Sequence, residues 1–188
     1  MNIGLYFGSF NPIHTGHLII ASNVANDTSL DQVWLVVSPQ NPLKAKGQLL
    51  NEYHRFRLVQ LAVEDDSRLR ASDIEFKLPR PSYTIDTLVH LQEKYPKHQF
   101  SLILGSDSYQ NIENWKNHNI LLSDYDMVIY KRPGFPPGIV HERAKVLQAP
   151  LLEISASTIR NCIKSGKSIR YMVPDKVREE LEANHYYR

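Results

Sequence analysis

The feature that most constrains the fold is a regular alternation of short apolar runs with longer amphipathic stretches. Apolar runs bounded by Gly, Pro, Asp or Ser are typical of strands buried on both faces. The sequence contains such runs at Ile3–Phe7, Val33–Val37, Phe100–Leu104 and Met127–Tyr130. Apolar residues at three- and four-residue spacing predict helices over Leu18–Val24, Glu52–Val63, Thr84–Tyr95 and His141–Leu147.

This alternation predicts an α/β fold with a doubly wound parallel sheet, in which helices cover both faces. Ligands of such sheets bind beyond the carboxyl ends of the strands. Two irregular segments, Pro39–Gly47 and Arg132–Gly138, follow predicted strands directly. We therefore expect both segments at the ligand-binding edge of the sheet.

The last part of the sequence follows a different pattern. Ser155–Lys164 and Asp175–Ala183 predict two helices, with Pro174 opening the second, and no strand-like run separates them. We expect these helices to form a C-terminal helical cap. For the helix predicted over 84–95, either Ser82 or Thr84 is the expected N-cap.

The length and composition allow one sizeable core. The chain has 188 residues, of which 42% are hydrophobic, so we expect a single domain over residues 1–188. The 22 Lys and Arg residues against 20 Asp and Glu leave a formal charge of +2, a balance too even to indicate a nucleic-acid partner. Small molecules are the expected ligands.

The single cysteine and the N-terminal sequence bear on the cellular location. Cys162 has no second cysteine to pair with, and its place in a predicted helix indicates a buried or half-buried thiol in a reducing compartment. The first residues lack the basic region of a signal peptide, and no window approaches the roughly 20 apolar residues that span a bilayer. The sequence predicts a soluble, cytoplasmic protein without a membrane partner.

The strongest candidate site is the segment GSFNPIHTGH at residues 8–17, which joins the first predicted strand to the first predicted helix. Gly8 lets the backbone approach a phosphate closely, and the free N–H groups of a first helical turn favour an anion. His14 and His17 are three residues apart and can share one face of that turn, with Gly16 leaving room between them. The two imidazoles are suited to donate to a phosphoryl group during transfer.

Two simpler interpretations of the histidine pair stand beside this one. The pair can be a coincidence of surface composition, or two ligands of a zinc ion. The zinc hypothesis lacks a neighbouring Cys, Glu or third His to complete a site, so we predict no dedicated metal ligand. The glycine-containing loop around the histidines favours phosphate.

The segment at residues 8–17 and a second motif near the other end of the chain together resemble the two signatures of the HxGH nucleotidyltransferase superfamily. Residues 154–160, ISASTIR, are similar to the superfamily's second signature and lie about 140 residues after the first. Ser155 or Ser157 can cap the helix, and Arg160 can offer a guanidinium to the phosphates of ATP. An ordinary capped helix is the alternative for this segment taken alone.

The resemblance narrows to the bacterial nicotinate mononucleotide adenylyltransferases and extends over nearly the whole chain. Residues 81–88, PSYTIDTL, are similar to their substrate loop, and residues 104–107, LGSD, followed by Trp115, to their Gly-x-Asp segment and ring-stacking tryptophan. Residues 130–134, YKRPG, resemble their Arg-Pro-Gly turn. Lys44 lies where the family has a basic residue for the triphosphate, although the family's Pro-His-Lys is Pro42-Leu43-Lys44 here.

The resemblance implies a Rossmann-like nucleotidyltransferase fold and a set of roles. The residues implied for ATP are Gly8, Ser9, Phe10, His14, Gly16, His17, Gly105, Asp107, Ser155, Ser157, Thr158 and Arg160. Those implied for the mononucleotide are Ser82, Tyr83, Thr84, Trp115 and Arg132, and those implied for catalysis are His14, His17, Lys44 and Arg160. Magnesium is expected to accompany ATP, and a homo-oligomer is compatible with the sequence.

Each middle motif also has an ordinary structural interpretation. Trp115 can be a core anchor, Asp107 can cap a helix, and Arg132 can be solvated. Residues 165–168, SGKS, end like a phosphate-binding P-loop, but position 161 is Asn161 rather than Gly and a helix precedes them, so we reject that motif.

The implied reaction is a direct attack by the mononucleotide phosphate on the α-phosphorus of ATP, with nicotinate mononucleotide as the acceptor. Adenylyltransferases for phosphopantetheine or nicotinamide mononucleotide are the nearest rivals, and the 81–88 loop and Trp115 disfavour the first. A non-catalytic nucleotide-binding module is the rival of a different class. Such a module needs neither histidine, whereas this sequence has both.

Overall fold

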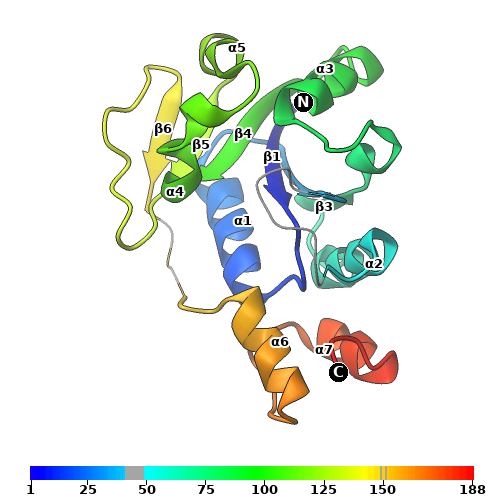
Figure 1. The fold of residues 1–188 in the computed structure, drawn as a ribbon. Helices are drawn as coiled ribbons and strands as arrows, with labels where there is room; N and C mark the ends of the chain where they lie inside the picture. The colour runs from blue at the N-terminus through cyan, green and yellow to red at the C-terminus, as the bar shows by residue number, and fades with distance from the viewer. Residues whose placement is uncertain (41–48, 149, 151) are drawn as a thin grey trace.

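The computed structural model describes residues 1–40, 49–148, 150 and 152–188. Over these residues it contains one sheet of parallel strands in the order β3-β2-β1-β4-β5-β6 (Figure 1). The strands are β1 (Asn2–Gly8), β2 (Gln32–Val37), β3 (Leu69–Ser72), β4 (Gln99–Gly105), β5 (Met127–Tyr130) and β6 (Ala144–Leu147). The sequence prediction of a doubly wound parallel sheet is confirmed.

Strand β1 occupies the centre of the sheet. Its residue Gly8 is in register with Val37 of β2, and its Tyr6 is in register with Ile103 of β4. The chain winds outward from β1 to β2 and β3, then crosses back to β4 on the other side of β1. Loops leaving β1 and β4 therefore diverge at this point, which is where parallel sheets bind their ligands.

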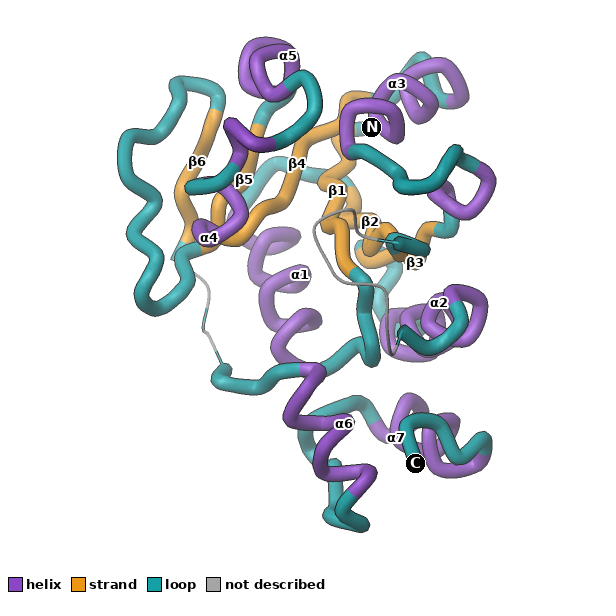
Figure 2. Tube along the Cα trace, in the orientation of Figure 1, coloured by secondary structure: helices purple, strands orange, loops and turns teal. Residues whose placement is uncertain are grey.

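Helices cover both faces of the sheet (Figure 2). The helices are α1 (Thr15–Asp27), α2 (Glu52–Val63), α3 (Thr84–Lys94), α4 (Ser106–Tyr109), α5 (His118–Asp124), α6 (Ala156–Lys164) and α7 (Asp175–Ala183), with short 3-10 helices η1 (Ile74–Lys77) and η2 (Ile112–Asn114). Because side chains alternate along a strand, Ile3 and Leu5 of β1 pack with α3 and α5, whereas Tyr6 packs with α1 and α2. Among the described residues no helix is both long and apolar enough to cross a membrane.

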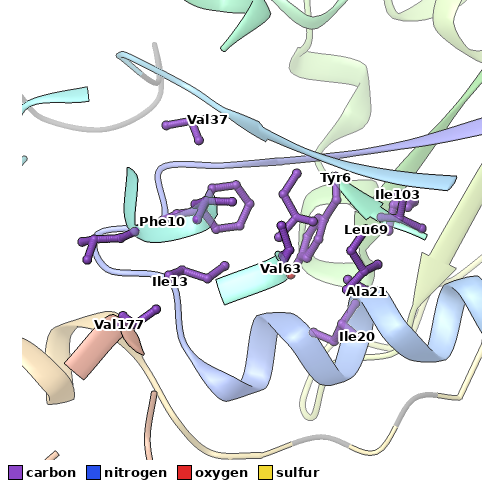
Figure 3. Close-up of a cluster of buried hydrophobic side chains, with 14 of the residues drawn as sticks. Tyr6, Phe10, Ile13, Ile20, Ala21, Val37, Val63, Leu69, Ile103 and Val177 are labelled. Atoms are coloured by element: carbon purple, nitrogen blue, oxygen red, sulfur yellow. The ribbon is translucent and has the colours of Figure 1, made fainter. Parts of the chain in front are cut away.

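The last two helices, α6 and α7, lie together at one end of the molecule in Figure 1. Helix α7 packs against α2, and its Lys176 forms ion pairs with Glu64 and Asp65 just after α2. The buried Val177 of α7 belongs to the same apolar cluster as Phe10 and Ile13 of the loop after β1 (Figure 3). The predicted helical cap is thus confirmed, and it is joined to the core through the loop that carries the histidines.

One predicted helix is wrong. The spacing of apolar residues in His141–Leu147 indicated a helix, but Ala144–Leu147 is strand β6 at the edge of the sheet. Val146 and Leu147 are in register with Ile129 and Tyr130 of β5. Pairing with a neighbouring strand outweighs a short periodic pattern, because seven residues carry too little helical preference to resist it.

Strand β3 and the N-terminal ends of three helices also differ in part from the sequence prediction. Strand β3 was missed because its sequence, LRAS, lacks an apolar run. Neither Ser82 nor Thr84 caps α3: its N-cap position is Tyr83, which makes no side-chain capping bond. Asp107 lies inside α4 rather than at its N-cap, which is Gly105. Of Ser155 and Ser157, the two caps expected for α6, Ser155 occupies the N-cap position, and its hydroxyl accepts a bond from the Thr158 N–H.

A buried arginine on α2 holds several loops at the carboxyl edge of the sheet. Arg55 is only 1% exposed, and the burial lowers the pKa of its guanidinium. Its nitrogens donate to the main-chain carbonyls of Ser9, Ser38, Pro39 and Leu50. One side chain therefore fixes the ends of β1 and β2 and the start of α2 relative to one another.

We predict that Arg55→Met lowers the free energy of unfolding by about 3 kcal/mol, because buried carbonyls lose their donor. The exposed Arg57 on the same helix supplies the control: Arg57→Met should change stability by less than about 0.5 kcal/mol. Urea denaturation monitored by circular dichroism measures both values. Equal losses for the two variants would show that the carbonyl contacts of Arg55 contribute nothing specific.

Candidate active site

A cleft of about 1370 Å³ opens over the carboxyl ends of the central strands. Its walls come from the loop after β1, the first turns of α1, α3 and α6, and the residues that follow β4 and β5. These segments are far apart in the sequence, and the topology of the sheet brings them together. The cleft is large enough to hold two nucleotides, since drug-sized ligands occupy roughly 300–1,000 Å³.

Most residues predicted for the site line this cleft. They are Gly8, Ser9, Phe10, His14, Gly16, His17, Ser82, Tyr83, Thr84, Gly105, Asp107, Trp115, Arg132, Ser155, Ser157 and Arg160. Thr158 does not: it lies on a separate pocket of about 180 Å³ with the half-buried Cys162, and its hydroxyl is bonded to Ser155 Oγ at 2.8 Å. Lys44 lies outside the described residues.

His14 stands at the start of α1 with an unused polar atom. Its side chain is buried, and its Nδ1 has no hydrogen-bond partner among the described residues. Burial, together with the charge of Arg132, lowers the pKa of His14 to about 4, so the imidazole is neutral near pH 7. Gly16 permits this placement, because a Cβ there would lie 3.1 Å from His14 Nδ1. Nδ1 itself is enclosed and faces the backbone N–H of His17 in a capping box, so the other ring nitrogen is the one suited to carry the proton and donate to a ligand.

His17 is oriented by its neighbour. Its ring stacks on that of His14 with centroids 3.7 Å apart, and its Nδ1 accepts the backbone N–H of His14 at 3.3 Å. Since Nδ1 is an acceptor, a neutral His17 carries its proton on Nε2. The pair therefore presents imidazole N–H groups as donors at the mouth of α1.

Helix α6 brings a cation to the same wall. The guanidinium of Arg160 donates from Nη1 to the Asn11 carbonyl at 2.7 Å and from Nη2 to Ser157 Oγ at 3.1 Å. The two bonds fix the fork of Arg160 beside the loop that carries the histidines. A planar, fixed guanidinium is well suited to phosphate oxygens.

Beyond β4 and β5 lies a second charged group. Arg132 Nε is 3.2 Å from Asp107 Oδ1, and Arg132 Nη2 donates to the Tyr130 hydroxyl at 3.0 Å. A Cβ at Gly105 would overlap the Asp107 carboxylate and lie 3.1 Å from the Tyr130 hydroxyl. Glycine at this position is therefore required by the close approach of the ion pair to the end of β4.

The opposite end of the cleft is formed by α3 and the segment around Trp115. Trp115 is half-buried: it packs partly against the core, as the core-anchor interpretation expects, and it also lines the cleft. Lys116 lies 4.9 Å from the centre of the Tyr83 ring and pairs with Asp86 at 2.9 Å. An aromatic ring beside the first turn of a helix suits a flat, anionic ligand.

Glu75, which the sequence interpretation missed, organises this end. Its buried carboxylate accepts bonds from Ser82 Oγ and Thr87 Oγ1, each at 2.9 Å, and burial raises its pKa. The hydroxyl of Ser82 thus points at Glu75 and helps to hold the segment before α3 in place. A carboxylate three residues after β3 was the available signal, but β3 itself has no apolar run to reveal it.

The carboxylates and imidazoles of the described residues bear on how the cleft could bind a metal ion. Over residues 1–40, 49–148, 150 and 152–188, no group of three His, Cys, Asp or Glu side chains is placed to hold a metal ion. Asp107 lines the cleft, and its Oδ1 makes no hydrogen bond within the described structure beyond the ion pair with Arg132. A hydrated divalent ion held mainly by phosphate oxygens fits this donor set, whereas an ion held by protein side chains alone does not.

Comparison with known proteins places the sequence among the nucleotidyltransferases. Residues 5–162 match the model of the cytidylyltransferase-like family. A protein of Flavobacterium johnsoniae named "probable nicotinate-nucleotide adenylyltransferase" is 49% identical, with complete coverage of both chains. One of the same name from Cytophaga hutchinsonii is 51% identical, covering all of this chain and 98% of its own.

Solved structures agree with the fold. The nicotinic acid mononucleotide adenylyltransferase of Plasmodium falciparum, complexed with NaAD, superposes with a TM-score of 0.81 at 22% identity. The match covers 99% of this chain and 97% of that one. At this identity the likeness bears on the fold alone, and it extends over the sheet and both C-terminal helices.

The depressed pKa of His14 gives a pH-dependent stability that can be measured. Because the folded protein holds His14 neutral down to about pH 4, while the unfolded chain takes up the proton near pH 6.5, acidification favours unfolding between these values. We predict that the wild type loses about 3 kcal/mol more stability between pH 7 and pH 4 than His14→Gln. Urea denaturation at half-unit pH steps gives the difference, and parallel curves for the two proteins would contradict it.

Proposed function

Because this chain belongs to the cytidylyltransferase-like family and, within it, to the nicotinate-nucleotide adenylyltransferases, we propose that it transfers the adenylyl group of ATP to nicotinate mononucleotide. The products are nicotinate adenine dinucleotide and pyrophosphate. The observation that carries the proposal is the meeting of His14, His17 and Arg160 at one end of a cleft whose other end holds Trp115.

The residues at the histidine end are suited to a phosphoryl group in transit. In an in-line attack, negative charge accumulates on the oxygens of the transferred phosphorus. A neutral imidazole offers one N–H to these oxygens, and Arg160 adds a fixed positive charge. The acceptor phosphate is already ionised near pH 7, so no general base is required. These side chains position the substrates and stabilise the charge of the transition state, and the two substrates react directly with each other.

Magnesium belongs to this proposal as a companion of the triphosphate. When bound, it supplies positive charge to the phosphate oxygens and keeps several water ligands. Asp107 is the carboxylate of the cleft that we expect to face those waters. Arg132, held beside Asp107 by the Tyr130 hydroxyl, adds a cation to the same wall.

The acceptor end supports a flat ring that carries a carboxylate. Trp115 offers a face for stacking, and the first turn of α3 offers backbone N–H groups near Tyr83 and Thr84. A carboxylate accepts hydrogen bonds only, whereas a carboxamide brings donors of its own. Donors at this end therefore favour nicotinate over nicotinamide.

Three broader expectations stay predictions. A cytoplasmic location suits ATP and a charged mononucleotide as substrates. The predictions that residues 1–188 form a single domain and that the chain forms a homo-oligomer likewise rest on the sequence. The roles of Lys44 and Thr158 toward ATP are proposed on the resemblance alone, because the first lies outside the described residues and the second faces another pocket.

His17→Ala is expected to lower turnover by two orders of magnitude or more, since one transition-state donor contributes about 3 kcal/mol. Pyrophosphate release is measured with ATP, magnesium and nicotinate mononucleotide, and the thermal midpoint serves as the control for folding. Near-normal turnover would remove His17 from the mechanism. Absence of pyrophosphate from the wild type with every acceptor would favour a nucleotide-binding module instead.

Nicotinate mononucleotide should be preferred over nicotinamide mononucleotide by at least tenfold in kcat/KM. The reason is that the NH2 group of the carboxamide would face N–H donors of the protein and find no acceptor. Trp115→Ala should raise the KM of both acceptors and leave this ratio nearly unchanged, since both rings stack alike. The two acceptors are assayed at the same ATP and magnesium concentrations. A ratio near one, or a preference for the amide, would contradict the acceptor assignment but not adenylyl transfer.

A further inference from the structure

The segment after α7 returns to the loop that carries the histidines. Tyr187, four residues beyond the end of α7, is partly buried, and its hydroxyl donates to Asn11 Oδ1 at 2.6 Å. The two residues are 176 positions apart in the sequence. Tyr187 is not among the residues that line the cleft, and the hydrogen bond of its hydroxyl connects it to the cleft through Asn11.

Asn11 is a junction between the loop and the arginine of α6. It is 5% exposed, its Oδ1 also accepts the backbone N–H of Leu50 at 3.1 Å, and its carbonyl accepts Arg160 Nη1 at 2.7 Å. One residue therefore receives bonds through its side chain from Tyr187 and Leu50, and through its main chain from Arg160. A rotation of Asn11 would move the acceptor on which Arg160 rests.

The residues next to Asn11 make the loop dependent on support, which the bond between Tyr187 and the Asn11 side chain supplies in part. Phe10 adopts a positive φ of 42°, a backbone conformation that a bulky residue rarely takes without support from its surroundings. Phe10 and Ile13 are buried in the core on either side of Asn11 (Figure 3). Burial raises the pKa of Tyr187, so its hydroxyl keeps the proton that it donates.

We propose that Tyr187 is a positioning residue for the reaction: its hydroxyl fixes the Asn11 side chain, so that the loop after β1 and Arg160 keep the geometry that the phosphates require. The idea rests on the proposed adenylyl transfer only for its kinetic consequence. The structural consequence, a loop held by the hydroxyl of Tyr187, is independent of the reaction.

The adjacent tyrosine supplies a matched control. The hydroxyl of Tyr186 is bonded to His54 Nδ1 on α2 at 2.8 Å, and within the described part of the chain it makes no hydrogen bond to the loop after β1. Tyr186→Phe and Tyr187→Phe each remove one hydroxyl from the same segment and keep the ring. They differ in whether the lost bond ends on α2 or on Asn11.

The first experiment compares the kinetics of these two variants. Tyr187→Phe should lower kcat roughly tenfold while the KM of nicotinate mononucleotide stays within about twofold, because the distant acceptor end is untouched. Tyr186→Phe should keep kcat within about twofold of the wild type at a similar small loss of thermal stability. Equal kcat values for the two variants, or a change confined to the KM of the mononucleotide, would overturn the proposal.

A double-mutant cycle locates the route of the effect. In an Asn11→Ala background, Tyr187→Phe should cause no further loss of kcat, since its partner atom is already absent. Independent, multiplying losses would mean that Tyr187 acts on something other than Asn11. That outcome would also overturn the proposal.

A readout without catalysis separates this idea from the proposed function. The amide N–H groups of Thr15 and His17 are bonded to the carbonyls of Met172 and His14, each at 2.9 Å, so their hydrogen exchange reports on the loop. Tyr187→Phe should speed their exchange at least fivefold, and Tyr186→Phe should not. If the wild type transfers no adenylyl group, this comparison still decides the role of Tyr187, and unchanged exchange would refute it.

Discussion

The parallel pairing of β1 with both β2 and β4 is the constraint on which the rest of the structure depends. It places Gly8 and Gly105, the last residues of β1 and β4, at the same edge of the sheet and sends the loops that follow them apart. The space between these loops becomes the cleft. The positions of the histidines, Asp107 and Arg132 follow from this arrangement.

The loop after β1 is held firmly from several sides. Apolar side chains of the loop enter the core, Arg55 binds the Ser9 carbonyl from α2, and Arg160 and Tyr187 bind Asn11 from the C-terminal segment. Groups that stabilise a transition state act best when they need not reorganise during the reaction. The C-terminal cap therefore contributes to the site twice: α6 supplies a cation, and the segment after α7 helps to hold the loop on which that cation rests.

The sequence predicts the elements that have strong local patterns, and it does not predict those that depend on contacts with distant parts of the chain. The four apolar runs predicted the four inner strands of the sheet. Strands β3 and β6 lie at its edges: the first has no apolar run, and the second lies in a segment whose apolar spacing indicated a helix. Contiguous motifs marked most of the residues that line the cleft. The roles of Glu75, Asn11 and Arg55 were not predicted, because they arise from contacts with residues distant in the sequence. No sequence spacing indicates that one carboxylate will accept bonds from two hydroxyls, or that one guanidinium will donate to four carbonyls.

We propose that one cleft holds both substrates, with phosphates at the histidine end and the nicotinate ring at the tryptophan end. A crystal structure of the protein with nicotinate adenine dinucleotide tests this arrangement most directly. We expect a phosphate within hydrogen-bonding distance of His14, His17 or Arg160 and the nicotinate ring against Trp115. A dinucleotide bound outside the cleft, or bound with adenine against Trp115 and nicotinate beside the histidines, would contradict it.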